Sequence, residues 1–142
     1  MTEKVLLVDD EEDFLEVMGE RLSSRGIDVT TSTSAEEALE LIEVDIYDAV
    51  ILDLQMPVMD GIDTLKKIKK RHPEIQVILL TGHATVKKGV EAMKLGAMDF
   101  VEKPADLEVL SEKIKKAYKK KMLIVDKANK KRVIDALKRY GF

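Results

Sequence analysis

Short apolar runs alternate along this chain with segments of helical periodicity, and this alternation limits the possible folds more than any other feature. The runs expected to form strands are residues 5–8, 27–31, 49–52, 77–80 and 100–101. Most are apolar without interruption, which is typical of strands covered on both faces. Five strand-then-helix units in succession predict an α/β fold, in which helices cover both faces of a parallel sheet.

Between and after these runs, apolar residues recur at the three- and four-residue spacing of a helix with one buried face. The residues expected to face inward on the five helices are Phe14, Val17, Met18 and Leu22; Ala38, Leu41 and Ile42; Ile62, Leu65 and Ile68; Val86, Val90 and Met93; and Leu107, Leu110, Ile114 and Ala117. Ser34 and Glu37 have the spacing of a capping box, and Gly26 and Gly96 are helix stop signals.

The size and composition of the chain exclude several classes of protein. Its 142 residues suit one domain with a short appendage. The absence of cysteine excludes a disulfide framework, a thiol nucleophile and a thiolate metal site. No apolar run approaches the ~20 residues that span a bilayer, and the first apolar run is too short for a signal peptide. We therefore expect a cytoplasmic protein without a membrane span.

Polar side chains stand where the expected strands end. These residues are Asp9 and Asp10 after the first strand, Asp53 after the third, Thr81 after the fourth and Lys103 after the fifth. Ligand sites of open parallel sheets lie beyond the carboxyl ends of the strands, so we expect these side chains to converge. Three carboxylates in one place repel one another, and a cation relieves this repulsion. Their hard oxygen atoms select Mg²⁺ or Mn²⁺ rather than zinc.

Such a site accommodates a phosphoryl group. Mg²⁺ takes few protein ligands and leaves other positions for waters or phosphate oxygens. Lys103 can neutralise a phosphate, and Thr81 can donate its hydroxyl to another phosphate oxygen. A carboxylate can accept a phosphoryl group covalently, and catalysis of such a transfer consists mostly of positioning and charge neutralisation.

The whole constellation resembles the receiver domain of two-component response regulators. The matching motifs are Val5-Leu6-Leu7-Val8-Asp9-Asp10-Glu11, Leu52-Asp53-Leu54-Gln55-Met56-Pro57 with Asp60-Gly61, Leu80-Thr81-Gly82, and Phe100-Val101-Glu102-Lys103-Pro104. The resemblance covers residues 3–120 and implies a flavodoxin-like, doubly wound five-stranded sheet of order 2-1-3-4-5. Residues 81–100 are most similar to the nitrogen-regulator subfamily. Its members usually carry ATPase and DNA-binding domains, which these 142 residues do not include.

The resemblance implies a function and a role for each acidic residue. Asp53 would accept a phosphoryl group from a phosphohistidine on a sensor histidine kinase. Mg²⁺ would be bound directly by Asp10, mostly through water by Asp9, by Asp53 itself and by the backbone carbonyl of Gln55. The protein would be a phosphoacceptor switch rather than an enzyme, catalysing only its own phosphorylation and dephosphorylation.

The resemblance also implies the switching residues. Thr81 and Lys103 would bind the phosphoryl oxygens, and the Lys103–Pro104 peptide bond would be cis. The added phosphoryl charge would draw Thr81 inward, and Phe100 would turn into the vacated space. This movement would repack the face formed by the fourth helix, the fifth strand and the fifth helix. A downstream effector protein, or an output domain absent from these residues, would detect the change.

Two other classes of protein share parts of this pattern. Phosphatases of the haloacid-dehalogenase type use a second Asp two residues after the nucleophile, but Gln55 stands there and cannot transfer protons. Nucleotide- and flavin-binding proteins with this sheet need a glycine-rich loop after the first strand. Here that loop reads Asp9-Asp10-Glu11-Glu12, which repels phosphate in the absence of a metal.

The end of the chain differs from the rest in charge. From Lys115 onward, eleven basic residues stand against two acidic ones, so this part carries +9 and the remainder −12 of the total of −3. We divide the chain into a receiver domain, residues 1–120, and a basic helical extension, residues 121–142. Either Asp126 caps a separate helix, or the fifth helix simply continues.

The extension contains an apolar run, residues 122–125, that needs burial either on the domain or in a homodimer. Its basic face suits nucleic acid, an anionic membrane or an acidic partner. A solvated basic helix is the simpler interpretation, and nucleic acid is not an expected partner.

Overall fold

The computed structural model describes residues 2–56, 60–82 and 86–141, and of Val86 only the backbone is described. The motif residue Pro57 and the expected helix start at Thr85 lie outside these ranges. Five parallel strands form one sheet of order β2-β1-β3-β4-β5. They are β1 (Lys4–Val8), β2 (Asp28–Ser32), β3 (Ala49–Asp53), β4 (Gln76–Thr81) and β5 (Asp99–Glu102). The predicted fold class and strand order are confirmed.

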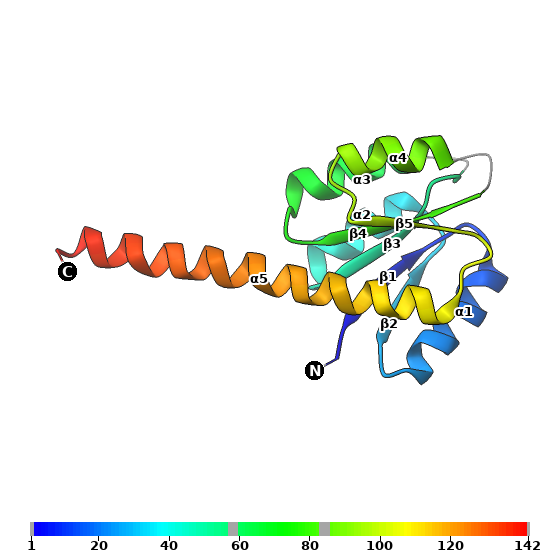
Figure 1. Cartoon of the computed structure of the whole chain (residues 1–142), viewed down its shortest axis with the longest axis horizontal. Helices are drawn as coiled ribbons and strands as arrows, with labels where there is room; N and C mark the ends of the chain where they lie inside the picture. Colours follow the sequence, from blue (N-terminus) through cyan, green and yellow to red (C-terminus); the bar gives the residue numbers. More distant parts are fainter. Residues whose placement is uncertain (1, 57–59, 83–85, 142) are drawn as a thin grey trace.

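In the described ranges, helices cover both faces of the sheet (Figure 1). They are α1 (Glu12–Ser24), α2 (Ala35–Val44), α3 (Gly61–Arg71), α4 (Val86–Lys94) and α5 (Leu107–Arg139). Helices α1 and α5 pack on one face, and α2, α3 and α4 pack on the other. Because side chains alternate along a strand, Leu6 joins the core under α2–α4 while its neighbour Leu7 joins the core under α1 and α5.

Local signals in the sequence explain where several helices begin and end. The Ser34 hydroxyl accepts a hydrogen bond from the Glu37 backbone N–H at 3.1 Å, as the capping box predicts. Asp60 caps α3 in the same way, accepting from the N–H of Ile62 at 2.9 Å. Gly26 follows α1 with a φ of 82°, which an L-side chain adopts only with strain.

Three residues expected in the core are on the surface instead. Val17 of α1 is 47% exposed, and Val90 and Met93 of α4 are 51% and 38% exposed. Among the α4 side chains that the structure describes, the buried ones are the small residues Gly89 and Ala92. A Cβ atom on Gly89 would already lie 3.3 Å from Thr81 and Phe100, so this part of the inner face has no room for a large side chain, and Val90 and Met93 point outward.

Helix α5 is one uninterrupted helix of 33 residues. The prediction of a separate helix capped by Asp126 is wrong, and the alternative of a continuing helix is correct. Residues 107–117 pack on the sheet, Lys121 still contacts the domain, and the end of the helix projects away from it (Figure 1). In this single chain, Leu123 is 71% exposed, so the apolar run at 122–125 is not fully buried on the domain. Among the described residues, no helix is long and apolar enough to cross a membrane.

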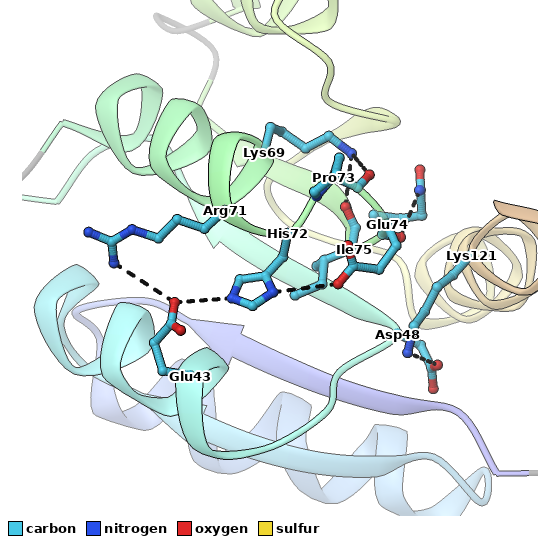
Figure 2. Close-up of polar contacts among 10 residues, drawn as sticks. Glu43, Asp48, Lys69, Arg71, His72, Pro73, Glu74, Ile75 and Lys121 are labelled. Atoms are coloured by element: carbon cyan, nitrogen blue, oxygen red, sulfur yellow. Dashed lines mark hydrogen bonds and ion pairs between the residues drawn. The ribbon is translucent and has the colours of Figure 1, made fainter. Parts of the chain in front are cut away.

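A buried ion pair joins α5 to the residue that precedes β3 (Figure 2). The Nζ of Lys121 lies 3.0 Å from Oδ1 of Asp48, and both residues are more than nine-tenths buried. Oδ2 of Asp48 also accepts the backbone N–H of Lys4 at 2.7 Å. Beside this pair, His72 bridges α3 and α2 through Glu43, at 3.0 Å from Nε2. Asp48 immediately precedes β3, so this contact lies at the sheet edge opposite Asp53.

Candidate functional site

Three carboxylates converge at the carboxyl ends of β1 and β3. Asp9 and Asp10 follow β1 directly, and Asp53 is the last residue of β3. One oxygen atom of each lies within 4.8 Å of the other two. Asp9 is fully buried and Asp53 is 6% exposed, whereas Asp10 faces solvent. The parallel pairing of Val8 with Leu52 brings the two strand ends side by side.

Lys103 places its ammonium among these acids. Its Nζ lies 2.6 Å from Oδ2 of Asp9, and 3.6 Å from both Oδ2 of Asp53 and Oε1 of Glu11. Its backbone N–H donates to the carbonyl of Thr81 at 2.8 Å, which ties the residue to the end of β4. The Lys103–Pro104 peptide bond is cis, as expected.

Burial and the surrounding charges together determine the pKa of Asp53. Burial raises the pKa of its carboxyl above the usual range, and the neighbouring carboxylates of Asp9 and Asp10 raise it further. The Gln55 backbone N–H and the Lys103 ammonium act in the opposite direction, but they do not cancel the shift. Burial by itself lowers the pKa of Lys103, yet its hydrogen bond to Asp9 and the charges of the acids leave that pKa raised. The site therefore holds a charged lysine beside the Asp53 carboxylate, and additional positive charge would stabilise the ionised form of that carboxylate.

Thr81 lies at the end of β4 with no exposed surface. Its Oγ1 has no hydrogen-bond partner among the described residues. A buried hydroxyl left unpaired costs roughly 1–3 kcal/mol. The hydroxyl is thus available to donate to an incoming oxygen atom at this edge of the sheet.

Gln55 lies at the rim of the site. Its backbone N–H donates to Oδ1 of Asp53 at 3.0 Å and so holds that carboxylate in place. A Cβ atom built on Gly82 would lie 3.7 Å from Oε1 of Gln55, so this side chain stands beside the loop after β4. The role of the Gln55 carbonyl as a metal ligand stays a prediction.

The donor set fits a hard divalent cation. Carboxylate oxygens are the ligands that Mg²⁺ and Mn²⁺ prefer, and an exposed carboxylate such as Asp10 leaves positions for water. Among the described residues, this is the one cluster of three or more potential ligands close enough to share an ion. Asp9, Asp10 and Asp53 would hold the cation, which would supply charge neutralisation for a phosphoryl group.

Comparison with known proteins agrees with this geometry. Residues 5–115 match the family model described as the response regulator receiver domain, which spans more than half of the chain. The chain belongs to this family. Members of the family are the phosphoacceptors of histidine-kinase two-component systems.

Two curated relatives of this receiver are transcriptional regulators. The transcriptional regulatory protein ZraR of Escherichia coli K12 is 37% identical over 113 residues, or 80% of this chain and 26% of ZraR. The C4-dicarboxylate transport transcriptional regulatory protein DctD of Rhizobium meliloti is 34% identical over 132 residues, or 93% of this chain and 29% of DctD. The chain therefore spans about a quarter of the length of these relatives.

A solved structure of NtrX from Brucella abortus shares the fold of this receiver. It has a TM-score of 0.83 and 33% identity, covering 90% of this chain and 30% of NtrX. The expected similarity to receivers of the nitrogen-regulator type is confirmed.

Two residues near the site were not predicted from the sequence. Glu11 contributes a third carboxylate near Lys103, and the ring of Phe14 lies 4.6 Å from its Nζ. The unbroken acidic run 9–13 was a signal for Glu11. Phe14 was assigned only to the core, because helical spacing does not show that a ring at the start of α1 also contacts a lysine at the end of β5.

Proposed function

We propose that Asp53 is the phosphoacceptor of this receiver. In this proposal an Asp53 carboxylate oxygen attacks the phosphorus atom of a phosphohistidine on a sensor histidine kinase. The P–O bond to Asp53 forms as the P–N bond breaks, and the imidazole leaves with the bonding electron pair. The convergence of three carboxylates and the Lys103 ammonium at one sheet edge supports this assignment most strongly. Mg²⁺ or Mn²⁺ bound by Asp9, Asp10 and Asp53, with the carbonyl of Gln55, would neutralise the transferred group.

Lys103 and Thr81 would bind the phosphoryl oxygens once the group is on Asp53. The ammonium lies 3.6 Å from Asp53 and would move from Asp9 toward the new negative charge. The unpaired hydroxyl of Thr81 would donate to a second oxygen. Phe100, half-buried against the core under α4, would then occupy space that Thr81 leaves. We expect no activity beyond self-phosphorylation and self-dephosphorylation.

Intact-mass measurement with Mg²⁺ and acetyl phosphate tests the acceptor. The wild-type chain should gain one phosphoryl group, and Asp53→Ala should gain none. Asp63→Ala is the matched control, because Asp63 is an exposed acid in the first turn of α3 and should be phosphorylated normally. Chelation of the metal should prevent incorporation into the wild type and Asp63→Ala. A stable adduct on Asp53→Ala would move the acceptor elsewhere.

We further propose that residues 1–120 act as the receiver and residues 121–142 as an extension that transmits its state. The family model ends at residue 115, whereas the similarity to DctD extends over 132 residues. The receiver of a longer regulator would signal to an output domain, and a separate receiver to an effector protein.

The surface of the extension favours a second copy of the chain as its partner, in a homodimer. The described part of the extension exposes several large apolar side chains, namely Leu123, Ile124, Val133, Ile134, Leu137 and Tyr140. Sedimentation of the full chain should show a concentration-dependent dimer. Leu123→Glu should shift the chain toward monomer, whereas Lys127→Glu, at an exposed basic position, should not. A monomer at all concentrations would exclude this proposal.

A further inference from the structure

Gly89 lies where the two proposed switch residues meet. It is buried near the middle of α4. A Cβ atom built on it would lie 3.3 Å from Cγ2 of Thr81 and 3.3 Å from Cγ of Phe100. The threonine at the end of β4 and the aromatic ring on β5 therefore contact the same point of the helix. That point has no side chain.

The backbone of α4 does not explain this glycine. Positive φ angles occur among the described glycines at Gly26, Gly96 and Gly141, and Gly89 has none. A glycine inside a helix also lowers helix stability relative to alanine. What the position requires is space, because a methyl group would make both contacts closer than ordinary van der Waals contact.

We propose that Gly89 is a positioning residue of the switch: its missing side chain leaves the volume that Thr81 and Phe100 share when they move. This inference rests on the proposed function, which makes these two residues the switch. When Thr81 moves toward a phosphoryl group on Asp53, the Phe100 ring enters the space beside Gly89. A methyl group at position 89 fills part of this space and disfavours the phosphorylated conformation. It does not touch the acids that accept the phosphoryl group.

The test compares Gly89→Ala with Gly19→Ala in the full chain. Gly19 lies inside α1, and a Cβ there would meet only Cγ2 of Thr31, at an ordinary 3.5 Å. Both substitutions replace a mid-helix glycine by a better helix former, but only one lies beside the switch. The probes are beryllofluoride, which mimics a phosphoryl group on Asp53 in the presence of Mg²⁺, and the aromatic NMR signals of Phe100. These signals can be assigned because the chain has only three phenylalanines.

We expect both variants to be phosphorylated at Asp53 by acetyl phosphate. Gly19→Ala should bind beryllofluoride like the wild type and show the same shift of the Phe100 signals. Gly89→Ala should bind it about 3- to 10-fold more weakly, because coupling between the two sites is reciprocal, and its Phe100 shift should be smaller. Adding Phe100→Leu replaces the ring that enters this space by a smaller side chain. This change should restore most of the lost affinity.

Two results would overturn the inference. One is a Gly89→Ala variant with the same beryllofluoride affinity and Phe100 shift as Gly19→Ala. The other is a loss of affinity or folding in Gly89→Ala that Phe100→Leu does not reverse, since a purely structural defect predicts that result. Either one leaves the proposed function intact as long as the wild type is phosphorylated at Asp53. Absence of wild-type phosphorylation would remove the proposed function first, and this inference with it.

Discussion

Lys103 lies closer to Asp9 than to Asp53: its Nζ is 2.6 Å from the carboxylate of Asp9 and 3.6 Å from that of Asp53. The ammonium thus neutralises a carboxylate that we assign to the metal. This lysine and a divalent cation would therefore compete for the same negative charge.

Removal of the ammonium should therefore strengthen metal binding. Lys103→Met should bind Mg²⁺ about 3- to 10-fold more tightly, because a positive charge near the cation is lost. Titration calorimetry at constant ionic strength measures this affinity. Lys113→Met, which breaks an ion pair with Asp99 on β5, is the control and should leave the affinity unchanged. Weaker Mg²⁺ binding by Lys103→Met would contradict the competition.

The acidic cluster should destabilise the metal-free fold. Asp53→Asn removes a buried carboxylate whose pKa burial already raises, so without metal it should increase the free energy of unfolding by about 1 kcal/mol. Mg²⁺ should stabilise the wild type more than this variant, because it binds the folded wild type more tightly. Urea unfolding with chelator and with Mg²⁺ measures both effects. Asp63→Asn should show neither, and a destabilised Asp53→Asn in chelator would refute the prediction.

Gly61 should be intolerant of any side chain. A Cβ there would lie 2.7 Å from the Cα of Leu54 and 3.0 Å from the carbonyl oxygen of Asp53. Because both neighbours are backbone atoms, Gly61→Ala should destabilise the chain by about 2–3 kcal/mol and slow phosphorylation of Asp53. Urea unfolding and the rate of phosphoryl incorporation measure the two effects. Gly19→Ala has room for its methyl group and should be neutral or stabilising. Equal stability and equal phosphorylation rates of Gly61→Ala and Gly19→Ala would contradict this steric explanation.

The stability that the buried pair between Lys121 and Asp48 provides should depend on both side chains. Lys121→Met leaves the Asp48 carboxylate buried without its cation and should cost about 3–5 kcal/mol of stability. The double variant Lys121→Met with Asp48→Asn should recover much of this loss, since it removes the uncompensated charge. Urea unfolding of the four proteins forms the complete cycle. Additive effects would show that the pair contributes little.

The sequence predicted the sheet and the convergence of the site because both follow from local patterns. Apolar runs located the strands, and parallel strands must end at one edge, so Asp9, Asp53 and Thr81 had to meet there. Capping signals at Ser34 and a stop at Gly26 located helix ends for the same reason. Each of these strand, cap and stop signals depends on residues that are near one another in the chain.

Features that depend on the distance between elements could not be predicted in this way. Periodicity predicted that Val90 and Met93 face inward. In the structure they are exposed, and Gly89 and Ala92 are the residues buried against the sheet. The sequence identified Asp60-Gly61 as part of a family motif but gave no structural reason for the glycine. The need for a glycine there comes from the backbone of Leu54, which is in contact only after folding.

The length of α5 beyond the buried Lys121–Asp48 pair would convert a small rotation of the helix into a large movement of its end. Helix α5 continues about 18 residues past Lys121, which corresponds to about 27 Å at the rise of an α-helix. Pivoting α5 by about 10° around this ion pair would carry its far end through about 5 Å at that length. A subtle adjustment of packing on the sheet would thereby become a displacement large enough to separate or align two protein surfaces.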